Sequence, residues 1–174
     1  RQLANRGCSV TVFPCTAGAP EILETQPDGV LLSPGPGNPE LLDYAVDTVR
    51  GLAGKQPIMG ICLGNQLIAM AFGGKTFKLK FGHRGGNHPV KELATGHTHI
   101  TAQNHGYAVD ADCLPKELEI THINLNDNTV EGLRHKYLPM FSIQYHSEDF
   151  PGPLDSRYLF DNFIDMIKES QTKI

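Results

Sequence analysis

The residue best suited to nucleophilic chemistry is Cys62, which stands in the segment GICLG at 60–64. Glycines two positions away on each side match the G-x-nucleophile-x-G pattern of a sharp strand-to-helix turn. The strained turn needs small neighbours, and the start of a helix favours the thiolate form of a cysteine. The N–H of Leu63, first in that helix, would point toward an oxyanion. An ordinary buried cysteine in a glycine-rich connection is the alternative.

A thiolate that attacks an amide needs a base, which later protonates the leaving amine, and a group that holds this base. His146 and Glu148 follow directly after the apolar segment MFSI at 140–143. Residues two apart in an extended chain point the same way, so the carboxylate can lie beside the imidazole. The pair predicts an acid–base couple for Cys62. His–Glu pairs at this spacing also occur on ordinary solvated strands.

A loop rich in glycine and proline, SPGPGNP at 33–39, follows the apolar segment GVLL. Its glycines, Gly35 and Gly37, allow a ligand to approach the backbone closely, while the prolines stiffen the loop. The loop is suited to presenting N–H groups to a carbonyl oxygen or carboxylate. It lacks the lysine and the spacing of a phosphate-binding loop. A simple turn between strand and helix remains an alternative.

The elements that must position these residues change character along the chain. Short β-rich runs alternate with helical patterns in the first half, which predicts a parallel sheet with helices on both faces. Strand-like runs follow one another in the second half, which predicts an antiparallel part. The fold class is therefore α/β, with a mostly parallel central sheet, flanking helices and an additional antiparallel portion. We expect strands at 8–13, 29–33, 57–61, 75–80, 98–103, 118–125, 129–135 and 140–144, and helices at 20–26, 39–53, 63–73 and 155–169, the last capped by Asp155 or Ser156.

The composition is that of one globular domain without a membrane span. The 174 residues are 40% hydrophobic and 20% charged, with a formal net charge of −4. This balance argues against disorder and against a basic nucleic-acid-binding surface. The apolar runs are too short for a membrane helix, and the four cysteines form no C-x-x-C pair. The cysteine pattern fits a reducing setting, and we expect a cytoplasmic protein. Because the sequence opens in a helical pattern without Met, we also expect it to be part of a longer polypeptide.

Five histidines offer a different interpretation, that of a metal-binding module. His97 and His99 alternate on a predicted strand and share a face, as metal ligands can. Such histidines are more often exposed or hydrogen-bonded, and our interpretation of the active residues assigns no metal. The five are His83, His88, His97, His99 and His105.

Four segments together resemble the class I (triad) glutamine amidotransferases. GICLG is shared across that family, whereas FGHRGGNHPV, QNHGYAV and the PGP after the His–Glu pair resemble its carbamoyl phosphate synthetase branch, specifically the glutaminase domain of the small subunit. The resemblance covers nearly the whole chain. The segments are GICLGNQL at 60–67, KFGHRGGNHPV at 80–90, TAQNHGYAVD at 101–110 and FSIQYHSEDFPGPLD at 141–155.

The resemblance implies a flavodoxin-like core and release of ammonia from L-glutamine. Cys62 would be the nucleophile, His146 the acid–base and Glu148 its orienting carboxylate. The ammonia would pass to a large carbamoyl phosphate synthetase subunit, and ATP and Mg²⁺ are expected only there, with no cofactor in this chain. The product could serve pyrimidine or arginine synthesis. The implied substrate contacts are Gly35, Gly37, Leu63, Gln66, Asn104, Gly106 and Tyr107, with the amides of Gly35 and Leu63 forming an oxyanion hole.

Three residues depart from the family pattern. Asn65, Ser147 and Pro34 stand where His, Pro and Asn are usual, although Pro34 also occurs in the anthranilate synthase branch. We expect residues 1–174 to be a single glutaminase domain that lacks its first strand. Two alternatives stay open: a glutaminase of the anthranilate or GMP synthetase type, and a folded remnant that does not turn over.

Overall fold

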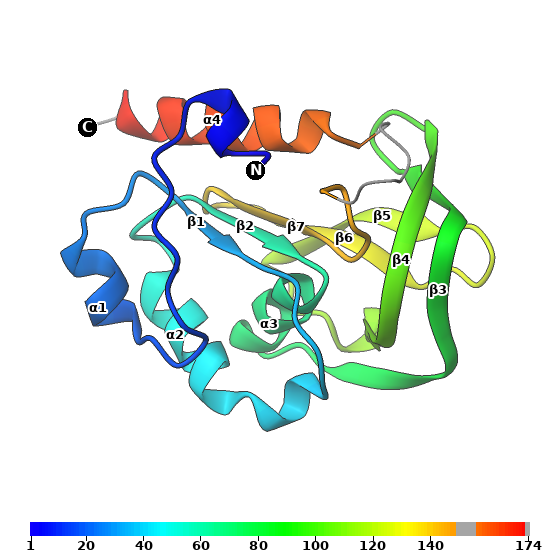
Figure 1. Cartoon of the computed structure of the whole chain (residues 1–174). Helices are drawn as coiled ribbons and strands as arrows, with labels where there is room; N and C mark the ends of the chain where they lie inside the picture. Colours follow the sequence, from blue (N-terminus) through cyan, green and yellow to red (C-terminus); the bar gives the residue numbers. More distant parts are fainter. Residues whose placement is uncertain (149–155, 173–174) are drawn as a thin grey trace.

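The computed structural model describes residues 1–148 and 156–172. Its centre is a seven-stranded mixed sheet in the order β1-β2-β7-β6-β5-β3-β4 (Figure 1). The pairings β1–β2 and β2–β7 are parallel, and the others are antiparallel. The α/β fold class with a parallel core and an antiparallel portion is confirmed. The strands are β1 (Val30–Leu32), β2 (Ile58–Ile61), β3 (Thr76–Glu92), β4 (Thr98–Val109), β5 (Leu118–Asn124), β6 (Val130–His135) and β7 (Met140–Ile143).

Helices cover both faces of the parallel part. Three lie on one face, α1 (Ala19–Glu24), α2 (Asp43–Leu52) and α3 (Leu63–Ala71), and α4 (Tyr158–Gln171) lies on the other (Figure 1). Strand β2 is buried throughout because both its faces are covered. Its residues alternate between the faces: Ile58 joins the core under α2 and α3, and Met59 joins the core under α4.

The antiparallel part is dominated by the long hairpin of β3 and β4. Its register shifts twice, between Lys78 and His83 and between Gly85 and His88. Such irregularities bend a ribbon and increase its twist. Strand β4 thereby meets the chain beyond β7, where an isolated bridge joins Ala102 to His146. The hairpin therefore closes over the carboxyl end of the parallel strands.

The run 8–13 is not a strand, contrary to our prediction. None of its residues belongs to a ladder in the described part of the chain, and Val10 and Val12 are 52% and 87% exposed. A β pattern becomes a strand only where a neighbouring strand offers N–H and C=O groups. The outer edge of β1, which in the described chain pairs with β2 alone, forms no ladder with this segment, so the backbone groups of 8–13 have no strand partner.

The remaining elements differ from prediction mainly at their ends. The helix expected at 39–53 is a 3₁₀ turn, Pro39–Leu41, followed by α2. The strand expected at 75–80 continues as β3 to Glu92. Helix α4 starts after Arg157 without a side-chain cap, so Ser156 is not its N-cap, and Asp155 lies outside the described residues. No helix in residues 1–148 or 156–172 has the length and apolar character needed to cross a bilayer.

Candidate active site

Cys62 occupies the turn between β2 and α3 in a strained conformation. Its φ of 53° and ψ of −102° lie where L-residues are rarely found. The N–H of Cys62 donates to the carbonyl of Ile143 on β7 at 2.8 Å, which fixes the turn to the neighbouring strand. The residue is 4% exposed. Leu63 begins α3, so its N–H has no partner within the helix and remains available for an anion.

The two flanking glycines are required by close backbone packing. A Cβ on Gly64 would lie 2.5 Å from the carbonyl oxygen of Leu32, and one on Gly60 would lie 2.8 Å from the backbone of Gly64. These separations are shorter than any side chain tolerates. The steric reason for small residues at ±2, which the sequence pattern predicts, is present in the structure.

His146 and Glu148 form a pair just beyond β7. Nδ1 of His146 donates to Oε1 of Glu148 at 2.8 Å, with side chains 17% and 31% exposed. The nearby Cys62 thiol and then the Glu148 carboxylate raise the pKa of His146 to about 10, against the opposing effect of burial. Nε2 makes no hydrogen bond of regular geometry within the described residues. This nitrogen is therefore free to exchange a proton with the thiol or a substrate.

Strand β4 holds the imidazole in place through the backbone. The N–H of His146 donates to the carbonyl of Ala102 at 2.9 Å. This contact, together with the Cys62–Ile143 bond, connects Cys62 and His146 to one sheet. The sequence offered no signal for it, because Ala102 lies in a different part of the chain.

Cys62 and His146 line one cavity of about 410 Å³. Leu63 is not part of the wall: its side chain packs so tightly on Gly35 that a Cβ there would lie 2.7 Å from Cδ2 of Leu63. Glu148 stands behind His146 and does not line the cavity either. Six of the seven expected substrate contacts do line it: Gly35, Gly37, Gln66, Asn104, Gly106 and Tyr107.

A buried amide network supports the floor of this cavity. The side chain of Gln66 donates to the carbonyl of Tyr107 at 2.9 Å and to the side-chain oxygen of Gln144 at 3.1 Å. Asn65, fully buried, donates to the same oxygen at 3.2 Å and accepts from Ser142 Oγ at 2.8 Å. Asn65 therefore joins α3 to β7 with neutral hydrogen bonds.

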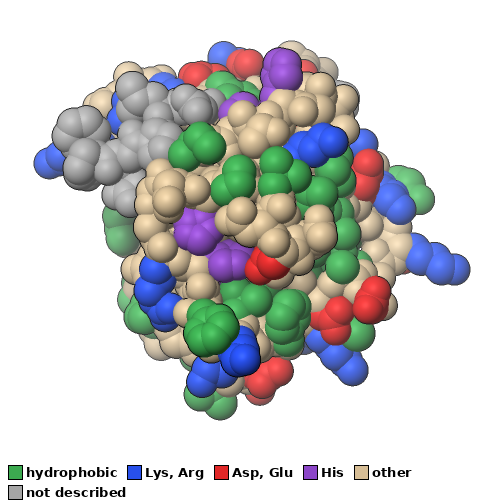
Figure 2. All heavy atoms as spheres, turned by 90° about the vertical axis from the view of Figure 1, so that its right-hand side faces the viewer, with side chains coloured by type: hydrophobic (Ala, Val, Ile, Leu, Met, Phe, Trp, Pro, Cys, Tyr) green, Lys and Arg blue, Asp and Glu red, His purple; other side chains and the backbone are tan. Residues whose placement is uncertain are grey.

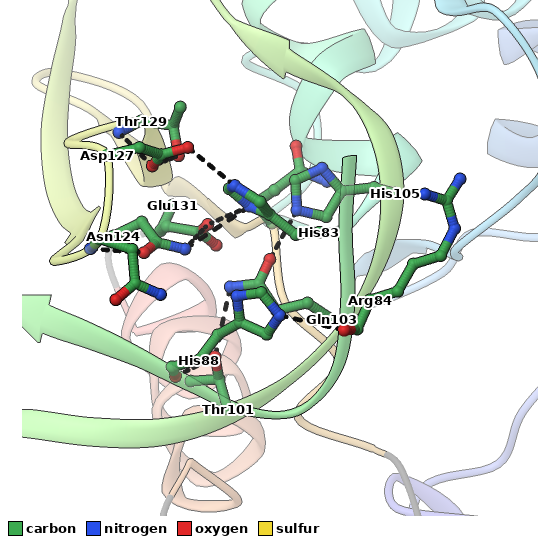
Figure 3. Close-up of polar contacts among 12 residues, drawn as sticks. His83, Arg84, His88, Thr101, Gln103, His105, Asn124, Asp127, Thr129 and Glu131 are labelled. Carbon is green, nitrogen blue, oxygen red and sulfur yellow. Dashed lines mark hydrogen bonds and ion pairs between the residues drawn. The ribbon is translucent and has the colours of Figure 1, made fainter. Parts of the chain in front are cut away.

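Two further lining residues, Arg84 and His105, were not among the expected contacts. Arg84 is exposed, and its side chain points away from the rings of His83 and His88 (Figure 3). It is the sole Lys, Arg, Asp or Glu among the described lining residues. His105 is 7% exposed, its Nδ1–H donates to the Tyr107 carbonyl at 2.8 Å, and burial lowers its pKa. Their place in the bent β3–β4 hairpin explains why spacing alone did not reveal them.

The five histidines considered as metal ligands do not form one cluster. His97 is exposed in the β3–β4 turn, and the ring of His99 packs against Tyr158 instead, 5.9 Å between centroids. The ring of His83 lies 5.2 Å from that of His88 and 4.8 Å from that of His105.

Comparison with known proteins agrees with this geometry. The family model "Glutamine amidotransferase class-I" matches residues 1–166. This chain belongs to that family. Relatives named carbamoyl phosphate synthase small chain are 60% identical in Staphylococcus epidermidis over 174 residues and 58% identical in Symbiobacterium thermophilum over 172 residues. The matches cover 99% and 98% of this chain, but it spans only 48% and 47% of the relatives, about half their length.

Solved structures of amidotransferases share the fold. A protein assigned to GMP synthase, from Thermoplasma acidophilum, superposes with a TM-score of 0.82 at 25% identity, over 98% of this chain and 87% of the other. A glutamine amidotransferase from Thermotoga maritima gives a TM-score of 0.60 at 19% identity, over 83% of this chain and 65% of the other. At 19% identity, the Thermotoga maritima protein shows only that the fold is shared.

Proposed function

We propose that this chain hydrolyses the side-chain amide of L-glutamine through a Cys62 thioester and supplies the ammonia for carbamoyl phosphate synthesis. The observation that carries the proposal is the meeting, at one cavity, of a thiol in a strained turn and an imidazole–carboxylate pair. His146 with a pKa of about 10 is protonated at neutral pH and can protonate a leaving amine.

The reaction begins when the Cys62 thiolate attacks the amide carbon of glutamine. The N–H groups of Leu63 and Gly35 stabilise the oxyanion, and the His146 imidazolium gives its proton to the nitrogen, which leaves as ammonia. The γ-glutamyl thioester remains. Neutral His146 then takes a proton from water, the hydroxide attacks the thioester, and glutamate leaves while the thiolate and imidazolium are restored. Glu148 orients the ring throughout.

Each step uses side chains and backbone groups of this chain, and we propose that the glutaminase reaction needs no cofactor here. The recipient of the ammonia would be a large synthetase subunit, which would hold ATP and Mg²⁺. The 58–60% identity to carbamoyl phosphate synthase small chains supports this branch over the GMP synthetase branch, whose structural relative is 25% identical. The free cysteines are consistent with our expectation of a cytoplasmic setting.

The substitution Cys62→Ser tests the glutaminase assignment. We expect release of glutamate from glutamine to be lost, while ammonia-dependent synthesis by the complex with a large subunit continues. Cys15→Ser is the matched control, because Cys15 is exposed and lies outside the cavity. Unchanged glutamine hydrolysis in the Cys62 variant would refute the assignment.

Co-purification tests the choice of branch. A tagged form of the protein should retain a large ATP-dependent carbamoyl phosphate subunit from its own cells. Retention of an anthranilate or GMP synthetase component in its place would overturn the branch and leave the glutaminase chemistry intact.

A further inference from the structure

A second group of polar side chains adjoins the cavity and takes no part in the proposed reaction. His83 on β3, His105 on β4 and Glu131 on β6 are 8%, 7% and 0% exposed. One ligand-type atom from each lies within 4.8 Å of the others. Figure 3 shows the side chains converging from these separate strands. The grouping arises only in the folded chain, because Glu131 is far from both histidines in sequence.

The outer nitrogen of each imidazole is already held by an acceptor. Nε2 of His83 donates to Oδ2 of Asp127 at 2.8 Å, and Nδ1 of His105 donates to the carbonyl of Tyr107 at 2.8 Å. Metal-binding histidines in proteins are oriented in this way, with the second nitrogen bonded to a carboxylate or carbonyl. The arrangement turns Nδ1 of His83 and Nε2 of His105 toward the interior of the cluster.

The carboxylate in the cluster has an unused oxygen. Oε1 of Glu131 accepts from Asn124 at 3.1 Å and lies 3.5 Å from Nδ1 of His83, a long contact. Oε2 is buried and has no hydrogen-bond partner among the described residues. A fully buried carboxylate oxygen without a partner is costly, and a cation at this point would satisfy it.

We propose that His83, His105 and Glu131 form a binding site for a divalent transition-metal ion of the Zn²⁺ type. Two imidazoles and a carboxylate are a known donor set for Zn²⁺, with a fourth position left for water. Ligand atoms around tetrahedral Zn²⁺ lie about 3.3 Å apart, so binding draws the three strands together by as much as ~1.5 Å. The side chain of Gln103, which contacts Nε2 of His105, rotates aside.

Two routes connect the buried cluster to solvent. Figure 2 shows histidine side chains reaching the surface near the centre of the β3–β4 face, next to an acidic side chain. Asp127 is 39% exposed at its side chain and His105 also lines the glutamine cavity, so two approaches to the cluster exist. A bound ion would cross-link β3, β4 and β6 beside the cavity. This role is independent of the glutaminase proposal.

The test measures metal binding in a Cys62→Ser background, so that the thiol cannot bind the ion. Equilibrium dialysis with Zn²⁺ should give one equivalent per chain, and Co²⁺ should give a visible d–d spectrum without thiolate charge transfer. Glu131→Gln, which removes the charged ligand, should abolish binding. Absence of binding to the parent protein would overturn the proposal.

A second variant keeps the test decisive if Glu131→Gln does not fold. Asp127→Asn changes a partly exposed side chain that orients His83 through Oδ2 and accepts from Thr129 through Oδ1, and it should weaken Zn²⁺ binding about 10–100-fold. Asp112→Asn, an exposed aspartate outside the cluster, should bind as the parent does. Equal affinity in the Asp127 and Asp112 variants would refute the assignment of His83 as a ligand.

Discussion

Replacing Glu148 by Gln removes the charge that holds the acid–base residue and leaves the shape of the side chain. Its carboxylate is the second contributor, after the Cys62 thiol, to the rise in the pKa of His146 from 6.5 to about 10. That rise corresponds to about 5 kcal/mol in favour of the imidazolium. A hydrogen bond to a charged group contributes about 1.5–3 kcal/mol, so we assign about 2 kcal/mol to the bond with Glu148, a factor of about 30 in an equilibrium constant.

The sign of the pH effect follows from the charge. Without the carboxylate the pKa of His146 falls, so the imidazolium that protonates the departing ammonia is lost at a lower pH. The alkaline limb of kcat/KM for glutamine hydrolysis should therefore move toward neutral pH in the variant. A change of about 30-fold in the acid constant still leaves most of His146 protonated at pH 8, so the fall in rate that we expect there, about 30-fold or more, comes from the lost orienting bond.

The assay is release of glutamate, measured from pH 6 to about pH 11 for both proteins. Glu169→Gln is the matched control, because it makes the same change of net charge at an exposed position on α4. Coincident pH profiles for the Glu148 variant and the parent would refute the role of Glu148. A lower rate with an unmoved alkaline limb would show that the carboxylate orients the ring without setting its pKa.

Two further predictions concern the structure around the nucleophile. Gly64→Ala should lower the free energy of unfolding by about 2 kcal/mol or more and impair hydrolysis, because the new Cβ would meet the carbonyl of Leu32. Chemical denaturation checks this against Gly86→Ala, whose Cβ meets no atom within 4 Å, and equal stability of the two would contradict it. Asn65→Ala should cost about 2–3 kcal/mol, because Ser142 Oγ is left buried without its acceptor. A thermal melt measures this, and a loss below about 0.5 kcal/mol would show that the network rearranges.

The strained turn at Cys62 was predictable because it depends on short-range sterics. Residues 60–64 combine a buried strand, a nucleophile and two glycines, and such a segment has few other conformations. The closeness of His146 and Glu148 was likewise predictable from a spacing of two residues. The alternation of strand and helix before residue 74 indicated the parallel sheet for the same reason, since hydrophobic periodicity is a local property.

The unpaired run 8–13 marks the limit of such patterns. Its residues have high β propensity, yet Val12 is 87% exposed and the backbone joins no ladder in the described chain. A helix forms its hydrogen bonds within its own segment, whereas a strand needs a neighbour that only the tertiary fold supplies.

By itself, the sequence determined the strained turn at Cys62 and the pairing of the His146 imidazole with the Glu148 carboxylate, since each is set by residues at most a few positions apart. Only the tertiary structure decided what surrounds them. The bends of the β3–β4 hairpin bring Ala102 to His146 and put Arg84 and His105 in the cavity wall. The fold also brings Glu131 to His83, the contact on which the proposed metal site depends. These meetings depend on strand order and register, which follow from the packing of the whole sheet.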